Sequence, residues 1–257
     1  MFKKINIGKK LLLAIIIPTL LSVGVISLIG YFTAKQTLED QSFKQLMAVR
    51  ESKKIQIENY FQQIRKQIST FSEDHMIIDA MLQFNSRFYM GRSGELSKSD
   101  EDQLRDYYKT EFLPRLNKNL EQTANIESFW PKQERILSIQ SEYLAANTFP
   151  TGEKDRMIDS KKKNLYSDAH VKYHPIIRNY LKTFGYYDIF LIDHESGSIV
   201  YSVFKEVDFG TSLLDGPYKD TNFAKAFRAA RMATKKDFVL MTDFEPYSPS
   251  YNAPAAF

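Results

Sequence analysis

Residues 11–34 read LLLAIIIPTLLSVGVISLIGYFTA, a run of 24 residues without a charged side chain. A helix of this length rises about 36 Å at about 1.5 Å per residue, which exceeds the hydrocarbon core of a membrane, about 30 Å thick. A buried helix of a soluble domain rarely needs so many apolar residues on every face. A cleaved signal peptide has an apolar region of only about 7–15 residues and a small-residue exit, which residues 31–35 (YFTAK) do not match. The run therefore predicts an uncleaved transmembrane helix.

The excess positive charge of the chain lies in front of this run. The leader, residues 1–10, contains four lysines and no acidic residue. Basic residues beside a membrane helix stay in the cytoplasm, so we expect a cytoplasmic leader and an extracytoplasmic position for the rest of the chain. The chain has 35 basic and 31 acidic residues, and the two signs balance once the leader lysines are set aside. We therefore expect the lipid bilayer as a partner and, with no basic aromatic patch, no nucleic acid.

Helical periodicity dominates residues 35–182. Apolar residues at steps of three or four mark its first part: Leu46, Val49, Ile57, Tyr60, Phe61, Ile64, Ile68 and Phe71. Neither Pro nor Gly occurs from residue 31 to residue 90, so the membrane helix can continue as one helix of about fifty residues. Such a helix is either a stalk that carries movement to the membrane or one amphipathic helix of a bundle. We expect further helices from Ser99 or Asp100 to 116 and over 154–182.

The residue pattern changes at Gly185, from helical periodicity to strand-like composition. Residues 186–193 and 198–204 are rich in aromatic and β-branched residues, as strands are, and residues 194–197 (HESG) are turn residues. These segments predict a β-hairpin, followed by a short helix at 222–232 and a third strand at 237–241. The expected fold class is α+β, with a transmembrane helix at 11–34, an extracytoplasmic helical region at 35–182 and an antiparallel sheet within 183–257.

Four segments carry a likeness to a known family: residues 184–193 (FGYYDIFLID), 197–208 (GSIVYSVFKEVD), 209–213 (FGTSL) and 242–250 (TDFEPYSPS). Together with the order of the elements, they resemble the extracytoplasmic Cache (PAS-like) sensor domains of bacterial receptors, above all those of methyl-accepting chemotaxis proteins. The resemblance implies a receptor in the bacterial cytoplasmic membrane that binds a small solute outside the cytoplasm and transmits the signal inward. It also implies a homodimer, and a sheet in which 242–250 adds the next strand.

Receptors of this kind continue into a second membrane helix and a cytoplasmic output module. This sequence ends on Ala255-Ala256-Phe257, which reads as the beginning of a strand. We therefore expect the domain at 183–257 to be truncated and the chain to be a receptor fragment. The sequence does not distinguish a chemotaxis output from that of a histidine kinase or a nucleotide cyclase, and it does not identify the solute.

The resemblance also implies a ligand pocket between the sheet and its covering loops, with aromatic walls and a few fixed charges. The candidate residues from these strands and loops are Tyr187, Tyr201, Lys205, Asp208, Asp243 and Tyr247. In such a pocket Asp208 or Asp243 can hold an ammonium group, and Lys205 can hold a carboxylate. Alternation along a strand places Tyr201 and Lys205 on one face. The alternative is that the tyrosines pack the sheet and the charged groups are solvated.

A membrane-tethered exported hydrolase is the alternative from another functional class. The chain contains no Cys, no G-x-S-x-G segment and no Walker-type loop. His170 and His174 stand four apart on an expected helix, but no acidic residue completes a metal motif such as H-E-x-x-H. We therefore expect no enzyme activity, no metal and no cofactor, with the histidines at the surface or in the core.

Overall fold

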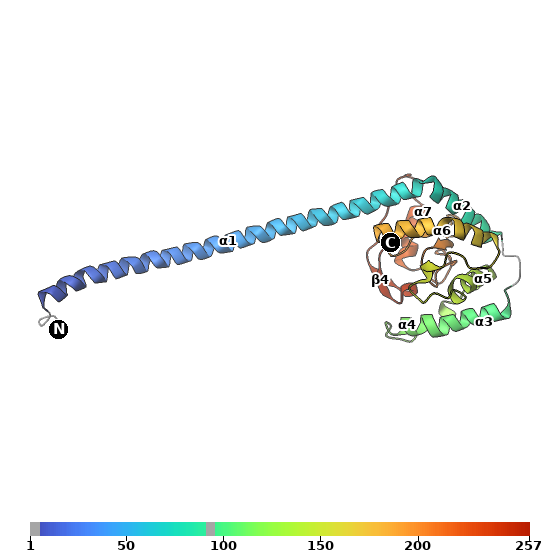
Figure 1. Ribbon diagram of the computed structural model, residues 1–257, viewed down its shortest axis with the longest axis horizontal. Coiled ribbons are helices and arrows are strands. Elements are labelled where there is room, and N and C mark those ends of the chain that lie inside the picture. Colours follow the sequence, from blue (N-terminus) through green and yellow to red (C-terminus); the bar gives the residue numbers. More distant parts are fainter. Residues whose placement is uncertain (1–5, 91–95) are drawn as a thin grey trace. The chain divides into compact units, whose positions relative to one another are not determined.

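The computed structural model describes residues 6–90 and 96–257, so part of the expected leader, residues 1–5, lies outside the described residues (Figure 1). The chain forms two compact units, Met1–Arg65 and Lys66–Phe257. Helices predominate, and two small antiparallel sheets accompany them. The expected α+β class is therefore confirmed. The boundaries expected at residues 34 and 182 stay predictions.

Helix α1 (Ile7–Glu73) is a single helix of 67 residues (Figure 1). Its first part is long and apolar enough to cross a membrane, a property that a signal sequence near the N-terminus shares. Pro18 lies inside the helix, and the Thr19 and Ser22 hydroxyls donate hydrogen bonds to main-chain carbonyls one turn earlier. The predicted continuation of the apolar run into a longer helix is confirmed. The helix ends at Glu73, and the side chain of the next residue, Asp74, accepts a hydrogen bond from the Met76 N–H and so caps the next helix.

In the described residues, the predicted hairpin is preceded by further α-helices: α2 (His75–Tyr89), α3 (Lys98–Tyr107), α4 (Leu113–Asn117), α5 (Glu134–Gln140) and α6 (Leu165–Phe184). Short helical turns join them: η1 (Tyr108–Phe112), η2 (Ile126–Ser128), η3 (Ser141–Ala145) and η4 (Lys154–Arg156). The expected start of α3 at Ser99 or Asp100 is wrong, because Ser97 is the residue whose side chain accepts the Asp100 N–H. The start of α6 at 154 is also wrong. Asn164 caps this helix through the Ser167 N–H, and Lys161 before it has a positive φ of 64°.

The predicted hairpin is present, with shorter strands than expected. Strands β1 (Phe190–Ile192) and β2 (Ile199–Ser202) pair antiparallel, with Leu191 opposite Tyr201. Helix α7 (Asn222–Arg231) follows, as predicted. The third strand expected at 237–241 is wrong: β3 (Glu245–Tyr247) pairs with β4 (Ala253–Ala255) in a separate two-stranded sheet, with η5 (Ser248–Ser250) between them.

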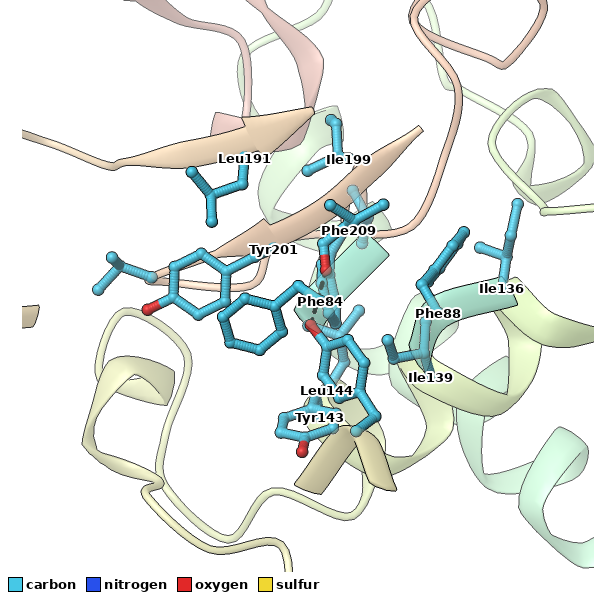
Figure 2. Packing of buried hydrophobic residues seen from close by; sticks show 14 of the residues in the cluster. Phe84, Phe88, Ile136, Ile139, Tyr143, Leu144, Leu191, Ile199, Tyr201 and Phe209 are labelled. Carbon is cyan, nitrogen blue, oxygen red and sulfur yellow. Dashed lines mark hydrogen bonds between the residues drawn. The ribbon is translucent and has the colours of Figure 1, made fainter. Parts of the chain in front are cut away.

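The core of the unit Lys66–Phe257 lies where α2 and α6 pack against the hairpin. Phe84 of α2 is fully buried, and its ring stacks on that of Tyr201 of β2 at 4.5 Å between centroids. Tyr166 of α6 contacts the same phenylalanine at 5.2 Å. Figure 2 shows Phe84 and Tyr201 side by side, with Phe209 and Leu191 close to them. Aromatic pairs add about 0.5–1.5 kcal/mol to simple burial, so this contact fixes β2 and the segment that follows it.

Candidate functional site

The segment after β2 is held by a half-buried carboxylate, that of Asp188. It accepts hydrogen bonds from the Ser202 hydroxyl at 2.7 Å and from the N–H groups of Val203 at 2.9 Å and Phe204 at 3.3 Å. Burial raises the pKa of Asp188 to about 6, although these hydrogen bonds favour its charged form. These hydrogen bonds fix the main chain immediately before Lys205, Glu206 and Asp208.

Tyr201 and Lys205 are brought together, but not by the predicted alternation along a strand, because β2 ends at Ser202 and Lys205 has a positive φ of 57°. The Lys205 ammonium lies 5.2 Å from the centroid of the Tyr201 ring, and both side chains are buried. Lys205 Nζ donates to the carbonyls of Ser202 and Val203, each at 3.0 Å, and lies 3.5 Å from Nδ1 of His174. Burial lowers the pKa of Lys205 to about 7. Since its protons already face acceptors of the protein, a carboxylate ligand would have to compete with them.

His170 and His174 stack in the core with centroids 4.2 Å apart. His174 donates from Nε2 to the Asp155 carbonyl and accepts at Nδ1 from the Tyr201 hydroxyl, each over 2.7 Å. Burial lowers the pKa of His174 to about 2, so its ring is neutral. Because both nitrogens of His174 are bonded to protein groups, the pair does not form a two-histidine metal site. The described residues contain no group of three metal-ligating side chains.

Asp208 is the other charged candidate that the fold buries. Its Oδ2 accepts the Tyr247 hydroxyl at 2.6 Å, while Oδ1 is buried without a hydrogen-bond partner. The hydroxyl of Tyr218 is also buried without a partner, and the Tyr218 and Tyr247 ring centroids lie 6.3 Å apart. Burial raises the pKa of Asp208 to about 7 against the effect of the Tyr247 hydrogen bond, and the Asp188 carboxylate raises it further. Buried polar atoms without a hydrogen-bond partner are uncommon and destabilising. Two of them, in the side chains of Asp208 and Tyr218, make this part of the core a candidate functional site.

Glu206 is the partly exposed carboxylate near Asp208. The side chain is half-buried, accepts the Ser250 hydroxyl at 2.8 Å and lies 3.4 Å from the hydroxyl of Tyr187, which is 67% exposed. Burial, followed by the charge of Asp208, raises the pKa of Glu206 well above its usual range. We call this set the carboxylate–tyrosine group: Tyr187, Glu206, Asp208, Tyr218 and Tyr247.

The six predicted residues thus separate into three cases. Asp208 and Tyr247 are in direct contact, and Tyr187 joins them through Glu206. Lys205 and Tyr201 form a pair with His174 instead. Asp243 is exposed, and its carboxylate accepts only the N–H of the next residue, whereas its main-chain carbonyl accepts the Asn222 side chain at 3.0 Å.

Two residues of the group were not among the sequence candidates. Glu206 stands two residues before Asp208, so the acidic spacing was visible in the sequence. Tyr218 follows the turn at 215–217 and gave no local signal, because a tyrosine after a turn is usually a packing residue. Its role here depends on a long-range contact with Tyr247.

A concave surface also lies along α1, lined by residues between Tyr31 and Leu46. One helix supplies all of its lining, so it is open and has no opposing wall that could hold a small molecule. The buried chemistry of the chain lies in the unit Lys66–Phe257.

Comparison with known proteins gives no relative: no family model, no curated protein and no solved structure matches the chain.

Proposed function

We propose that the chain is the sensory part of a membrane-anchored bacterial receptor of the Cache (PAS-like) type, and specifically of a methyl-accepting chemotaxis protein. It binds a small solute outside the cytoplasmic membrane and transmits a displacement inward, with no enzyme activity of its own. The charge-free run and the leader lysines support the anchor and its orientation. The alternative is that the chain is the sensor portion of a histidine kinase or a nucleotide cyclase, which differs from the first proposal only in its cytoplasmic output module.

The observation that carries this proposal is the continuity of α1, which joins the apolar run to the folded core without a break. The last turns of α1 belong to the unit Lys66–Phe257. There, the Tyr186 hydroxyl donates to Oε1 of Gln67 at 2.8 Å, and the Tyr180 hydroxyl donates to the Gln67 carbonyl at 3.2 Å. Phe71 packs on the Tyr180 ring at 4.2 Å between centroids. A helix fixed in this way can transmit a shift of the core along its axis.

A series of contacts leads from β2 to this end of α1. Tyr201 of β2 donates to His174 of α6. Tyr180 lies further along the same helix and donates to Gln67. We propose that a solute bound next to β2 changes the position of α6 and through it that of α1. The size of such a change is limited by the difference in the affinity of the solute for the two arrangements.

The orientation is tested by fusing alkaline phosphatase after residue 60 and expressing the fusion in a bacterium. We expect activity, because this enzyme folds only outside the cytoplasm. A cytoplasmic reporter at the same position should be inactive. Activity of the cytoplasmic reporter would overturn the proposed orientation.

Signal transmission is tested on the full chain in lipid nanodiscs. The chain contains no cysteine, so Ser42→Cys on the exposed surface of α1 provides a single cross-linking site for the expected homodimer. Amino acids, carboxylates, amines and nucleobases are screened for a raised thermal midpoint and a changed rate of disulfide formation. The proposal requires at least one solute that changes both, and it fails if none does.

A further inference from the structure

We infer that residues 235–243 form an interface between two copies of the chain, in which this segment pairs antiparallel with the same segment of the second copy. The inference goes beyond the proposed function, because it concerns a contact between chains and not the binding of a solute. The segment reads KKDFVLMTD, with apolar residues at its centre and charged residues at its ends. Its central part, residues 237–241, pairs with no strand in the described part of the chain.

The main chain of residues 239–241 has free hydrogen-bonding groups, because it makes no hydrogen bond with any described residue. At the end of the segment, the Thr242 N–H donates to the Phe257 carbonyl at 2.7 Å. Thr242 precedes β3 and Phe257 follows β4, so the contact between these two strands extends as far as Thr242. Residues 239–241 therefore adjoin a paired strand and present unpaired N–H and carbonyl groups, as an edge strand does.

The side chains of the segment alternate between two environments. Val239 and Met241 are half-buried, whereas Phe238 and Leu240 are exposed. This alternation is typical of a strand that has one face on the core. Proteins usually protect an exposed edge with a charged residue, a proline or a covering element, and residues 238–242 contain neither a charged residue nor a proline. The segment is therefore suited to pairing with a further strand, which would also cover the two exposed apolar side chains.

The charges at the two ends of the segment identify the partner as a second copy. Lys235 forms no ion pair with a described residue, and the Asp243 carboxylate accepts only a main-chain N–H. Lys236, by contrast, is paired with Glu73 at 3.3 Å. If Val239 lies opposite Val239 of the second copy, antiparallel order places each Lys235 opposite an Asp243, and the two-fold symmetry forms this ion pair twice. Opposite charges across paired strands are favourable and like charges are unfavourable, so the charges select antiparallel over in-register parallel pairing.

The experiment is disulfide cross-linking of the full chain in membrane vesicles, which the absence of cysteine makes specific. In the paired strands, Val239→Cys faces its own copy at a Cα separation of about 4.5–5.5 Å, within the range of a disulfide. Thr234→Cys, at an exposed position, is the matched control, because antiparallel pairing separates its two copies by about 33 Å. We expect Val239→Cys to cross-link at least tenfold faster than Thr234→Cys. Equal rates would overturn the inference, and cross-linking of Ser42→Cys in the same vesicles would leave the proposed receptor dimer standing.

Charge reversal tests the register in the Val239→Cys background. Lys235→Asp and Asp243→Lys should each slow cross-linking severalfold at low salt, because each brings like charges together. The double reversal exchanges the two charges and should restore the rate, and a double variant as slow as the single ones would refute the ion pair.

Hydrogen exchange on the unmodified chain guards the test against a folding defect in the variants. The amides of residues 239–241 have no hydrogen bond within the described part of the chain, so a single copy leaves them open to exchange. We expect the amides that face the second copy to be protected in the vesicles. Rapid exchange of all three would overturn the inference, and protection without cross-linking of Val239→Cys would assign the edge to another partner and overturn it as well.

Discussion

Tyr247 donates its hydroxyl hydrogen to Oδ2 of Asp208 over 2.6 Å, and both side chains are almost completely buried. The two residues are 39 positions apart in the sequence. Tyr247 ends β3, whereas Asp208 lies in the segment after β2, so this hydrogen bond joins the two small sheets. A single side-chain contact thereby fixes the wall of the proposed ligand site.

Tyr247→Phe removes this hydroxyl and leaves both oxygens of Asp208 without a donor. We expect the free energy of unfolding to fall by about 1–3 kcal/mol, the cost of an unsatisfied buried acceptor. The measurement is urea denaturation of the full chain. Tyr187→Phe is the matched control, because the Tyr187 ring is 67% exposed; it should change stability by less than about 0.5 kcal/mol. Equal losses in the two variants would show that the hydroxyl at 247 has no special role.

The stability of the chain should depend on pH through Asp208. Its pKa is raised from 3.8 to about 7 in the folded state, chiefly by burial. The folded state therefore binds this proton more tightly than the unfolded state, so folding is favoured at low pH. As the pH rises from about 4 to about 7, the stabilising effect of the protonated form is lost, and above this range no further loss occurs.

Asp208→Asn isolates this dependence, because the amide does not titrate. We expect the free energy of unfolding of the wild type, relative to this variant, to fall by roughly 2 kcal/mol or more between pH 4 and pH 8. Denaturant titrations at several pH values provide the measurement, and Asp220→Asn, at an exposed aspartate, should follow the wild type. A constant difference between wild type and Asp208→Asn would show that the carboxyl group does not change its protonation over this range.

Gly197 and Gly152 allow a test of crowding at the hairpin turn. Both have positive φ, 70° and 89°. A Cβ at Gly197 would lie 2.8 Å from Cγ of Leu214, whereas one at Gly152 would meet no atom within 4 Å. We expect Gly152→Ala to cost about 1 kcal/mol through backbone strain alone and Gly197→Ala about 2–4 kcal/mol, because a side chain must also move. Thermal unfolding of both variants measures the difference, and similar midpoints would refute the crowding argument.

The sequence identified those elements whose signal is local. The uninterrupted α1, the hairpin and α7 follow from periodicity and turn residues. The second sheet was not predictable in this way. Residues 253–255 (APA) have little strand propensity, yet they form β4 because Tyr251 and Asn252, with φ of 58° and 65°, turn the chain back onto β3.

The residues of the candidate site were likewise only partly predictable from the sequence. Asp208 and Tyr247 were candidates because a resemblance placed them in a pocket, while Tyr218 was missed because its contacts are long-range. Residues 237–241 illustrate the converse. Phe238 and Leu240 carry a strand-like pattern, but the hydrogen bonds between Phe257 and Thr242 lie beside this segment, and residues 237–241 pair with no strand in the described part of the chain. Whether such a segment forms a strand depends on its pairing with a distant segment, and the local sequence pattern does not specify that pairing.

Gln67 tests the coupling between the core and α1. Its side-chain oxygen accepts the Tyr186 hydroxyl at 2.8 Å, so Gln67→Ala removes this contact while the contact through its carbonyl remains. We expect a loss of about 1 kcal/mol in stability, unchanged solute binding and a smaller effect of the solute on Ser42→Cys cross-linking. Gln62→Ala, at an exposed position of the same helix, is the control and should keep the full response. Because binding and cross-linking are measured on the same sample, a reduced response with intact affinity points to transmission. A full response in Gln67→Ala would mean that the signal does not pass through this contact.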